Sequence, residues 1–238
     1  MIDKGEFDFV CRQTSDLDET LKACLRVEIA SALGRSVSDM FPAFSKAFPQ
    51  AASVIQSMYS PPFVLFKKHM GVWLRYLAME SGSANVFFEL VSQSVDVEGA
   101  EFEQDREMLP DRWKELYRYF SSFVVTESSV KPMNWVDTPF RYSARLSMER
   151  YCQINGLKSS MLKGFLKGIG SKNINCWLLT DDGDALFIDE QRCDRKVYHV
   201  RRNDLEGYCV LDDPEDVLDR YLAHFLCTRS SSGFDFRQ

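Results

Sequence analysis

The sequence lacks the features that direct a chain to a membrane or out of the cell. Acidic residues at Asp3, Glu6 and Asp8 occupy the N-terminus, so the basic stretch and following apolar run of a signal peptide are missing. No run approaches the roughly 18 apolar residues of a membrane helix. The longest patches, such as 61–66 and 86–91, are strand-sized or interrupted. We therefore expect a soluble cytoplasmic protein with no membrane partner.

Cysteine pairs and catalytic motifs are also missing. The seven cysteines form no CxxC pair and are odd in number, whereas a disulfide framework favours an even set. The motifs GxGxxG, GxxxxGK[ST], GxSxG and HExxH are absent. Of the three histidines, His69 and His199 lie among apolar or aromatic residues and are interpreted as structural, while His224 and Cys227 make at most half a metal site. We expect reduced thiols, no enzymatic activity, no metal and no cofactor.

Proline and glycine are scarce, with 8 and 12 residues in 238, which excludes a disordered or linker-dominated chain. Hydrophobic residues make up 45% of the chain and aromatic residues 13%. A chain of this length and composition can bury a sizeable core without a metal or a disulfide.

The first part of the chain is predicted to form helices, followed by a β-hairpin. Leu17, Leu21, Leu25 and Ile29 recur every four residues, which predicts a helix over 16–33 with Asp16 at its start and Gly34 at its end. A second helical stretch is expected over 36–58, broken at Pro42 and Pro49.

Aromatic and branched residues at 72–79 and 86–91 flank turn residues at 80–85. This pattern predicts a β-hairpin, with a helix over 67–79 as the alternative. Residues 96–108 are acidic and poor in large apolar groups, which indicates a linker. We therefore divide the chain into a region 1–108 and a region 109–238, which could also be one continuous domain.

The second region begins with a predicted helix that opens at 109–113. Pro110 is tolerated there because it lies early in the helix. Its apolar face is expected to contain Trp113, Leu116, Tyr117 and Phe120. A loop with Pro132 and Pro139 follows, and then a helical segment over 141–167 in two pieces that are divided near 155–156.

The last third of the chain changes to strands. Strands are predicted at 176–179, 185–188, 196–200 and 207–211, with a tight turn over 180–184. The sequence Asp-Asp-Pro-Glu-Asp at 212–216 is typical of a helix start, and the tail after Cys227 is expected to be frayed. Together these patterns predict an α+β fold with a helical N-terminal part, a central β-hairpin, and a C-terminal antiparallel sheet with flanking helices.

Charge is distributed unevenly along the chain, whose net charge is −6. Residues 1–140 and residues 173–238 each carry a net charge of −6. Residues 141–172, by contrast, contain seven basic residues and one acidic residue, Glu149. The acidic total argues against nucleic-acid binding and favours a cationic partner. The basic segment 141–172 could contact a membrane or nucleic acid, but a surface helix with one buried face is the simpler interpretation.

A cluster of acidic residues surrounds the predicted turn and the last helix start. Carboxylates in the turn could bind Ca²⁺ or Mg²⁺, but their spacing does not match an EF-hand, and a solvated hairpin turn or an acidic surface for a basic partner explains them as well. We predict a partner-binding surface with exposed aromatic residues beside these acids. It comprises Asp181, Asp182, Asp184, Asp189, Glu190, Tyr198, Tyr208, Asp212, Asp213 and Asp216.

The order of these C-terminal segments resembles that of the SUKH (SMI1/KNR4-like) superfamily. The resemblance is carried by 182–188, 196–200 and 210–225, together with the Leu-Pro-Asp-Arg-Trp sequence at 109–113, and covers at most residues 109–226. The Asn-Gly-Gly-type segment that the superfamily has after its first helix is missing, and 1–108 is not covered. A different immunity family with a similar order of strands and helices fits equally well.

This resemblance implies a bacterial immunity protein of a polymorphic-toxin or type VI secretion pair. Such a toxin–antitoxin partner would bind its cognate, basic protein toxin in the cytoplasm and block it without chemistry. The alternatives are an enzyme with an unrecognised site and a regulator that docks on a membrane or nucleic acid through 141–172. A homodimer is also compatible with the sequence.

Overall fold

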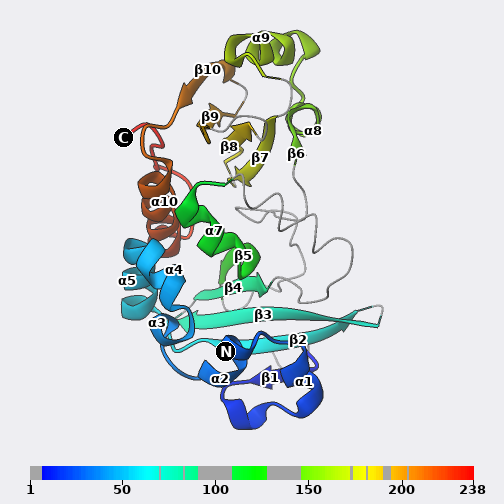
Figure 1. Ribbon diagram of the computed structural model, residues 1–238, viewed down its shortest axis with the longest axis vertical. Coiled ribbons are helices and arrows are strands. Elements are labelled where there is room, and N and C mark those ends of the chain that lie inside the picture. Colours follow the sequence, from blue (N-terminus) through cyan, green and yellow to red (C-terminus); the bar gives the residue numbers. More distant parts are fainter. Residues whose placement is uncertain are drawn as a thin grey trace.

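The chain forms two antiparallel sheets and a set of helices (Figure 1), which is the α+β fold that the sequence predicts. The computed structural model describes residues 7–69, 71–82, 84–90, 109–127, 146–171, 174–180, 182–189, 194–202 and 204–238. The first sheet has the order β1-β2-β3-β4-β5, and its strands are β1 (Phe9–Cys11), β2 (Phe63–His69), β3 (Val72–Ser81), β4 (Ala84–Leu90) and β5 (Phe120–Glu127).

The second sheet has the order β10-β9-β8-β7-β6 and lies above the first one in Figure 1. Its strands are β6 (Leu146–Ser147), β7 (Ile174–Leu179), β8 (Ala185–Asp189), β9 (Val197–Arg201) and β10 (Asp204–Val210). The four C-terminal strands that the sequence predicts are therefore confirmed, each shifted or extended by one to three residues.

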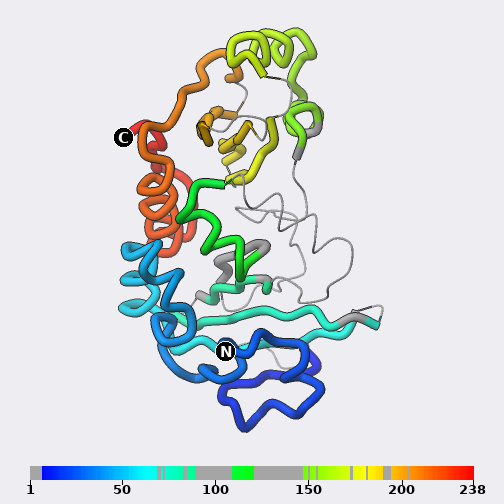
Figure 2. Tube along the Cα trace, viewed as in Figure 1, coloured from blue at the N-terminus to red at the C-terminus, as the bar shows by residue number. Residues whose placement is uncertain are grey.

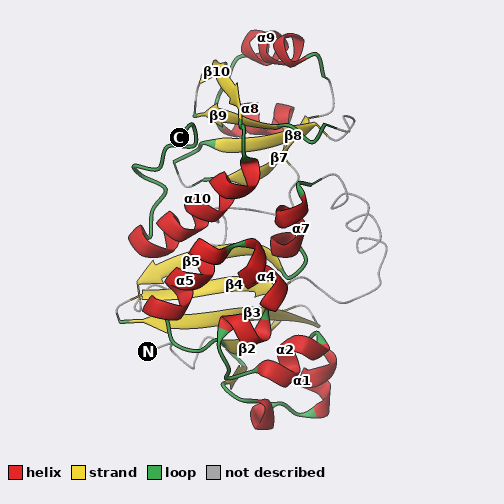
Figure 3. Ribbon diagram, turned by 60° about the vertical axis from the view of Figure 1, so that its left-hand side comes forward, coloured by secondary structure: helices red, strands yellow, loops and turns green. Residues whose placement is uncertain are grey.

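The N-terminal helices are short and follow one another closely. They are η2 (Thr14–Asp16), α1 (Glu19–Ala23), α2 (Val27–Ala32), α3 (Val37–Met40), α4 (Pro42–Ala47) and α5 (Pro49–Met58). The predicted breaks at Pro42 and Pro49 are confirmed, because each proline occupies the first helical position, where its missing N–H is not needed. Figure 3 shows α4 and α5 covering one face of the first sheet.

The prediction of one helix over 16–33 is wrong. The side chain of Asp18, not Asp16, caps α1 by accepting from the Leu21 N–H at 2.8 Å. The helix ends at Ala23, and Arg75 donates to the Cys24 carbonyl oxygen at 2.9 Å. Tertiary hydrogen bonds thus divide the predicted helix into α1 and α2, while the apolar stripe itself remains buried.

The β3–β4 hairpin confirms the predicted one, and the alternative helix over 67–79 is wrong. Ser81 pairs with Ala84, so the connecting turn is two residues long. Gly82 has a φ of +52°, in the left-handed region that such turns require and that glycine adopts without strain.

The next helix, α7 (Asp111–Tyr117), confirms the predicted helix start. Trp113, Leu116 and Tyr117 are buried on its inner face, as expected. Phe120 is buried too, but it begins β5 and so does not belong to the helix. The predicted linker at 96–108 and the loop with Pro132 and Pro139 lie outside the described residues.

The basic segment contains two helical pieces divided near 155–156, as predicted, but the predicted helical segment over 141–167 is wrong at Leu146–Ser147, which form β6 and pair with β7. The two pieces are α8 (Met148–Ile154) and α9 (Ser159–Ile169), and the turn between them contains Gly156 with a φ of +64°. Residues 141–145 lie outside the described part of the chain.

The last helix, α10 (Pro214–Thr228), starts as predicted. Asp213 accepts from the Asp216 N–H at 2.9 Å, and Pro214 occupies the first turn. The tail beyond it is not frayed, which corrects the prediction. Phe236 is only 3% exposed, and it packs against the ring of Tyr221 at 5.1 Å.

Helices from the two ends of the sequence pack against each other, as Figure 2 shows for α5 and α10. The carboxylate of Asp219, 1% exposed, accepts from the Gln50 and Ala51 N–H groups at 3.1 and 3.0 Å. It therefore caps the N-terminus of α5 from α10. Arg112 of α7 adds an ion pair to the same carboxylate at 3.4 Å, so three segments meet at one buried charge.

Candidate partner-binding surface

The predicted site residues separate to opposite ends of the second sheet. Asp182 and Asp184 belong to the β7–β8 turn, beside the β9–β10 turn. Asp212 and Asp213 follow β10, whose last residues pair with the start of β9 at the other end of the sheet. Because β8 advances by about 3.4 Å per residue, its five residues keep the two groups on the order of 14 Å apart. We call these ends the turn end and the α10 end.

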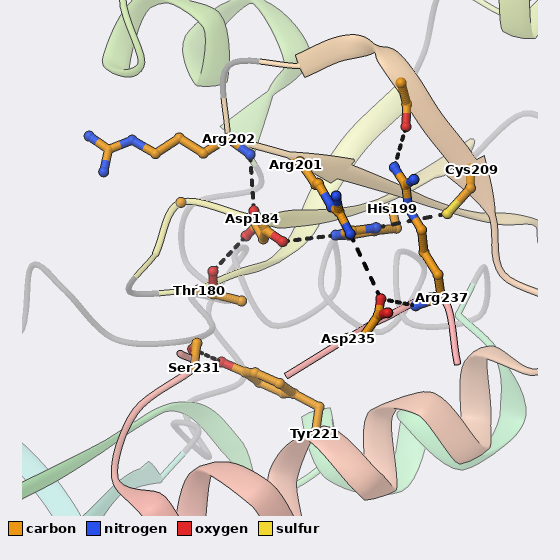
Figure 4. Close-up of polar contacts among 12 residues, drawn as sticks. Thr180, Asp184, His199, Arg201, Arg202, Cys209, Tyr221, Ser231, Asp235 and Arg237 are labelled. Atoms are coloured by element: carbon orange, nitrogen blue, oxygen red, sulfur yellow. Dashed lines mark hydrogen bonds and ion pairs between the residues drawn. The ribbon is translucent and has the colours of Figure 1, made fainter. Parts of the chain in front are cut away.

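At the turn end, Asp184 holds a short polar network together (Figure 4). Its Oδ2 accepts from His199 Nε2 at 3.0 Å, and its Oδ1 accepts from the Arg202 N–H at 3.0 Å. Burial opposes ionisation of this carboxyl, but the two hydrogen bonds outweigh it, so the pKa of Asp184 lies below its usual range. The carboxylate thus ties the two turns of the sheet to each other.

Because of this carboxylate, we expect the free energy of unfolding to decrease as the pH is lowered. A group whose pKa is lowered by folding stabilises the fold above its unfolded pKa, and that contribution is lost as the pH falls through the folded value. Asp184→Asn should therefore be less stable than the wild type at pH 7, by about 1–2 kcal/mol, and by a smaller amount at pH 3. Urea unfolding at both pH values tests this, with Asp212→Asn as control. An equal difference at both pH values would contradict it.

The other ring nitrogen of His199 faces Cys209, which sequence reasoning did not single out. The two are cross-strand partners on β9 and β10, and Nδ1 lies 3.8 Å from the thiol sulfur. Asp184, His199 and Cys209 thus stand in the order orienting group, base and nucleophile that covalent catalysis uses. However, burial raises the pKa of the Cys209 thiol, against the opposing effect of Arg237, and a protonated thiol is a poor nucleophile.

The C-terminal tail covers this network. Phe236 stacks on the His199 ring at 4.8 Å, and the ring is 1% exposed. Asp235 pairs with Arg201 at 3.9 Å, and Arg237 donates to the Gly207 carbonyl oxygen at 2.5 Å. The tail therefore closes the imidazole off from solvent.

The reactivity of Cys209 distinguishes a structural network from a catalytic one. We expect Cys209 to react with iodoacetamide more slowly at pH 7 than Cys227, whose side chain is exposed. Site-resolved mass spectrometry over time gives both rates in one sample. Faster labelling of Cys209 that disappears in His199→Ala would instead indicate an activated nucleophile.

Two of the predicted site residues are buried, and a third is half-buried. Tyr198 is 3% exposed and Asp189 is 1% exposed, and Tyr208 is half-buried against Phe165. The prediction of exposed aromatic residues is therefore wrong for Tyr198. Tyr208 of the neighbouring strand lies beside its ring at 6.2 Å, and the first four residues of β9 are all buried, so the strand has no solvent-facing side at this point. Asp181 and Glu190 lie outside the described residues.

At the α10 end, carboxylates from three segments gather around the starts of α7 and α10. Arg112 N–H donates to Glu215 at 3.1 Å, and the Trp113 indole donates to the Pro214 carbonyl oxygen at 2.9 Å. Arg195, from the β8–β9 loop, pairs with Asp111 at 2.7 Å. We call this group the acidic corner. It comprises Asp111, Asp194, Asp212, Asp213, Glu215 and Asp216.

Half of the acidic corner is already neutralised by neighbouring bases. Asp111 pairs with Arg195 and Lys114, and their hydrogen bonds lower its pKa. Asp216 pairs with Arg220 at 2.8 Å, and Asp194 pairs with Lys196 at 3.6 Å. Asp212, Asp213 and Glu215 have no cationic partner among the residues that the structure describes. These three carboxylates are therefore the part of the acidic corner whose charge no base in the described residues balances.

Of this corner, sequence reasoning identified the carboxylates at 212–216 but missed Asp111 and Asp194. The helix-start motif at 109–113 is visible in the sequence, but only the packing of α7 on α10 brings the start of α7 beside the start of α10. No local signal predicts that contact.

No helix in the described part of the chain is long and apolar enough to span a bilayer, and no group of three metal-ligating side chains is present in it. The cysteines that the structure describes are free thiols, namely Cys11, Cys24, Cys152, Cys176, Cys209 and Cys227.

Comparison with known proteins adds no relative. No protein-family model, no curated protein and no solved structure matches the chain.

Proposed function

We propose that the chain is a bacterial immunity protein that binds a cognate toxin in the cytoplasm and neutralises it by occlusion, without catalysis. Support comes from the segments that carry the SUKH-like resemblance. Residues 182–188, 196–200 and 210–225 fold largely as β8, β9 and α10, in the order that the resemblance implies. The leading sequence at 109–113 opens α7, which packs on the start of α10.

The observation that carries the proposal is the unpaired charge of the acidic corner. Asp212 and Asp213 are exposed, Glu215 is half-buried, and none has a cationic partner in the described residues. Neighbouring carboxylates make the local electrostatic potential more negative and so attract a basic surface. This attraction speeds association with a basic partner and disfavours acidic partners. A basic toxin is the partner that complements this corner.

An enzyme is the second candidate, because Asp184, His199 and Cys209 stand in catalytic order. The covering tail and the raised thiol pKa weigh against it. The labelling rate of Cys209 decides this point independently of any partner.

The test of the proposed function is a growth assay. The full chain serves as bait in a lysate of the native cell, and each captured protein is then expressed alone in a laboratory host. We expect one captured protein to arrest growth and co-expression of the wild-type chain to restore it. If no captured protein is toxic, or if the chain does not restore growth, the proposal is wrong.

A matched pair of variants locates the contact in the same assay. Asp212→Lys with Glu215→Lys changes the net charge from −6 to −2 and should weaken the rescue. Glu149→Lys with Glu206→Lys makes the same change at two exposed carboxylates outside the corner and should leave it intact. Equal rescue by both variants would place the contact elsewhere.

A further inference from the structure

Helix α9 presents a face that the rest of the chain does not use. Its apolar side is occupied, since Phe165 and Ile169 are buried and Phe165 packs edge-on against Tyr208 at 5.1 Å. The opposite side is exposed. It consists of Ser160, Lys163, Gly164, Lys167 and Gly168, with Lys158 just before the helix. Ser160, Lys163 and Lys167 lie three or four residues apart, as do Ser160, Gly164 and Gly168, so these residues form a continuous stripe, which we call the lysine face.

The lysine face carries uncompensated positive charge. Lys158, Lys163 and Lys167 have no ion-pair partner among the described residues, and α9 contains no carboxylate. Lys158 also stands at the helix N-terminus, where the macrodipole disfavours a cation. Elsewhere in the described chain, most bases have a carboxylate partner or an aromatic ring beside them. A carboxylate from outside the chain would relieve this local repulsion.

The two glycines of the face differ in what the fold requires. A Cβ at Gly168 would lie 3.2 Å from the Tyr208 hydroxyl, so packing explains that glycine. A Cβ at Gly164 would meet nothing within 4 Å, and a mid-helix glycine costs about 1 kcal/mol relative to alanine. The fold gives no reason for Gly164. A side chain there would, however, keep a second backbone away from the helix surface between Lys163 and Lys167.

The position of α9 makes the face accessible along its whole length. Figures 1 and 3 both show the helix lying crosswise at one end of the long axis of the molecule, with no other described element beyond it. A rod-like partner can therefore lie across α9 without meeting the rest of the chain.

We propose that the lysine face binds an acidic helix of a partner protein, which crosses α9 over Gly164 with its carboxylates toward Lys163 and Lys167. Lysines one turn apart, with Cβ atoms about 6 Å from each other, match glutamates at the same spacing on a second helix. No aromatic side chain of α9 is exposed for base stacking, and its apolar side is buried and unavailable to lipid.

The proposal takes the protein-binding role from the proposed function but concerns a different surface and an acidic ligand. The variants of the growth assay leave α9 unchanged, and the peptide titration does not use the toxin, so either proposal can fail alone.

The test is a fluorescence-anisotropy titration of the full chain. The probe is a labelled 21-residue alanine-based helical peptide with glutamate at every fourth position, in 20 mM NaCl. Lys163→Glu with Lys167→Glu lowers the net charge from −6 to −10 and should weaken binding at least tenfold. Arg35→Glu with Lys46→Glu makes the same change at two exposed bases without an ion pair in the described residues, and should change binding less than threefold.

Gly164→Gln separates docking from folding. Glutamine is a better helix former than glycine, and the space beside Gly164 is open, so the variant should melt at the same or a higher temperature than the wild type. Its affinity for the peptide should nevertheless fall about tenfold. Unchanged affinity in this variant would contradict the close helix crossing.

Two further arms test the identity of the occupant. A 20-base-pair RNA duplex and phosphatidylcholine vesicles with 30% phosphatidylserine replace the peptide under the same conditions. The proposal is overturned if the wild type does not bind the peptide, if both charge variants bind it equally, or if either polyanion binds more tightly than the peptide through Lys163 and Lys167.

Discussion

Replacing Phe236 with alanine is expected to lower the free energy of unfolding by about 3 kcal/mol, at the low end of the range for a buried phenylalanine. The side chain is 3% exposed and lies between the rings of His199 and Tyr221, at centroid distances of 4.8 and 5.1 Å. The cavity left behind would open the contact between the second sheet and α10. Urea denaturation monitored by circular dichroism gives the difference.

The control for this variant is Phe9→Ala, because Phe9 is 43% exposed and should lose less than about 1 kcal/mol. In a frayed tail the Phe236 side chain would be exposed, as Phe9 is, so the two variants would lose similar stability. A loss below 1 kcal/mol for Phe236→Ala would therefore restore the sequence-based prediction of a frayed C-terminus.

Replacing Asp219 with alanine is expected to cost about 3–5 kcal/mol, the range for breaking a buried charge network by removing one partner. The substitution leaves the Gln50 and Ala51 N–H groups without their acceptor and Arg112 without its buried carboxylate. It therefore removes the cap of α5 and the charge that joins α5, α7 and α10.

Asp216→Ala is the matched control for Asp219→Ala, since Asp216 lies one turn earlier on the same helix and makes a more exposed pair with Arg220. Such a pair contributes about 0.3–0.5 kcal/mol. Thermal and urea unfolding of the two variants should differ widely. Similar losses would show that Asp219 has no special role in joining the helices.

The sequence predicts those elements whose signal is local. Pro42 and Pro49 each fix a helix start through the missing N–H, and Asp213 with Pro214 fixes the start of α10. The β3–β4 hairpin follows from turn residues between two aromatic-rich segments. In each case a few neighbouring residues determine the backbone.

Predictions failed where distant groups compete with the local pattern. The stripe over 16–33 is buried as a helix pattern requires, yet Arg75 binds the Cys24 carbonyl and Arg26 binds the Arg118 carbonyl across the molecule. The Arg75 guanidinium occupies a backbone carbonyl between α1 and α2, and the Arg26 side chain holds the extended residue that precedes α2. The prediction of a frayed tail is wrong for a similar reason, because Phe236 packs against His199 and Tyr221 from other elements.

The sequence shows which acidic residues belong to the candidate site, but it does not show how the fold places them relative to one another. The acids at 212–216 are visible in the sequence, but their separation from Asp184 depends on the order of the strands in the sheet. The pairing of His199 with Cys209 depends on a register shift in β10, where Arg201 pairs with Asp204 but His199 pairs with Cys209. A regular hairpin would place position 206 opposite His199, and no residue pattern specifies the extra residues in advance.

The association rate of the chain with its captured toxic partner tests the central claim most directly. In 50 mM NaCl, we expect Asp212→Lys with Glu215→Lys to associate roughly tenfold more slowly than the wild type, and Glu149→Lys with Glu206→Lys to stay within about twofold. The gap should close in 500 mM NaCl, because salt screens exposed charges. Equal rates for the two variants in 50 mM NaCl would contradict recognition through the acidic corner.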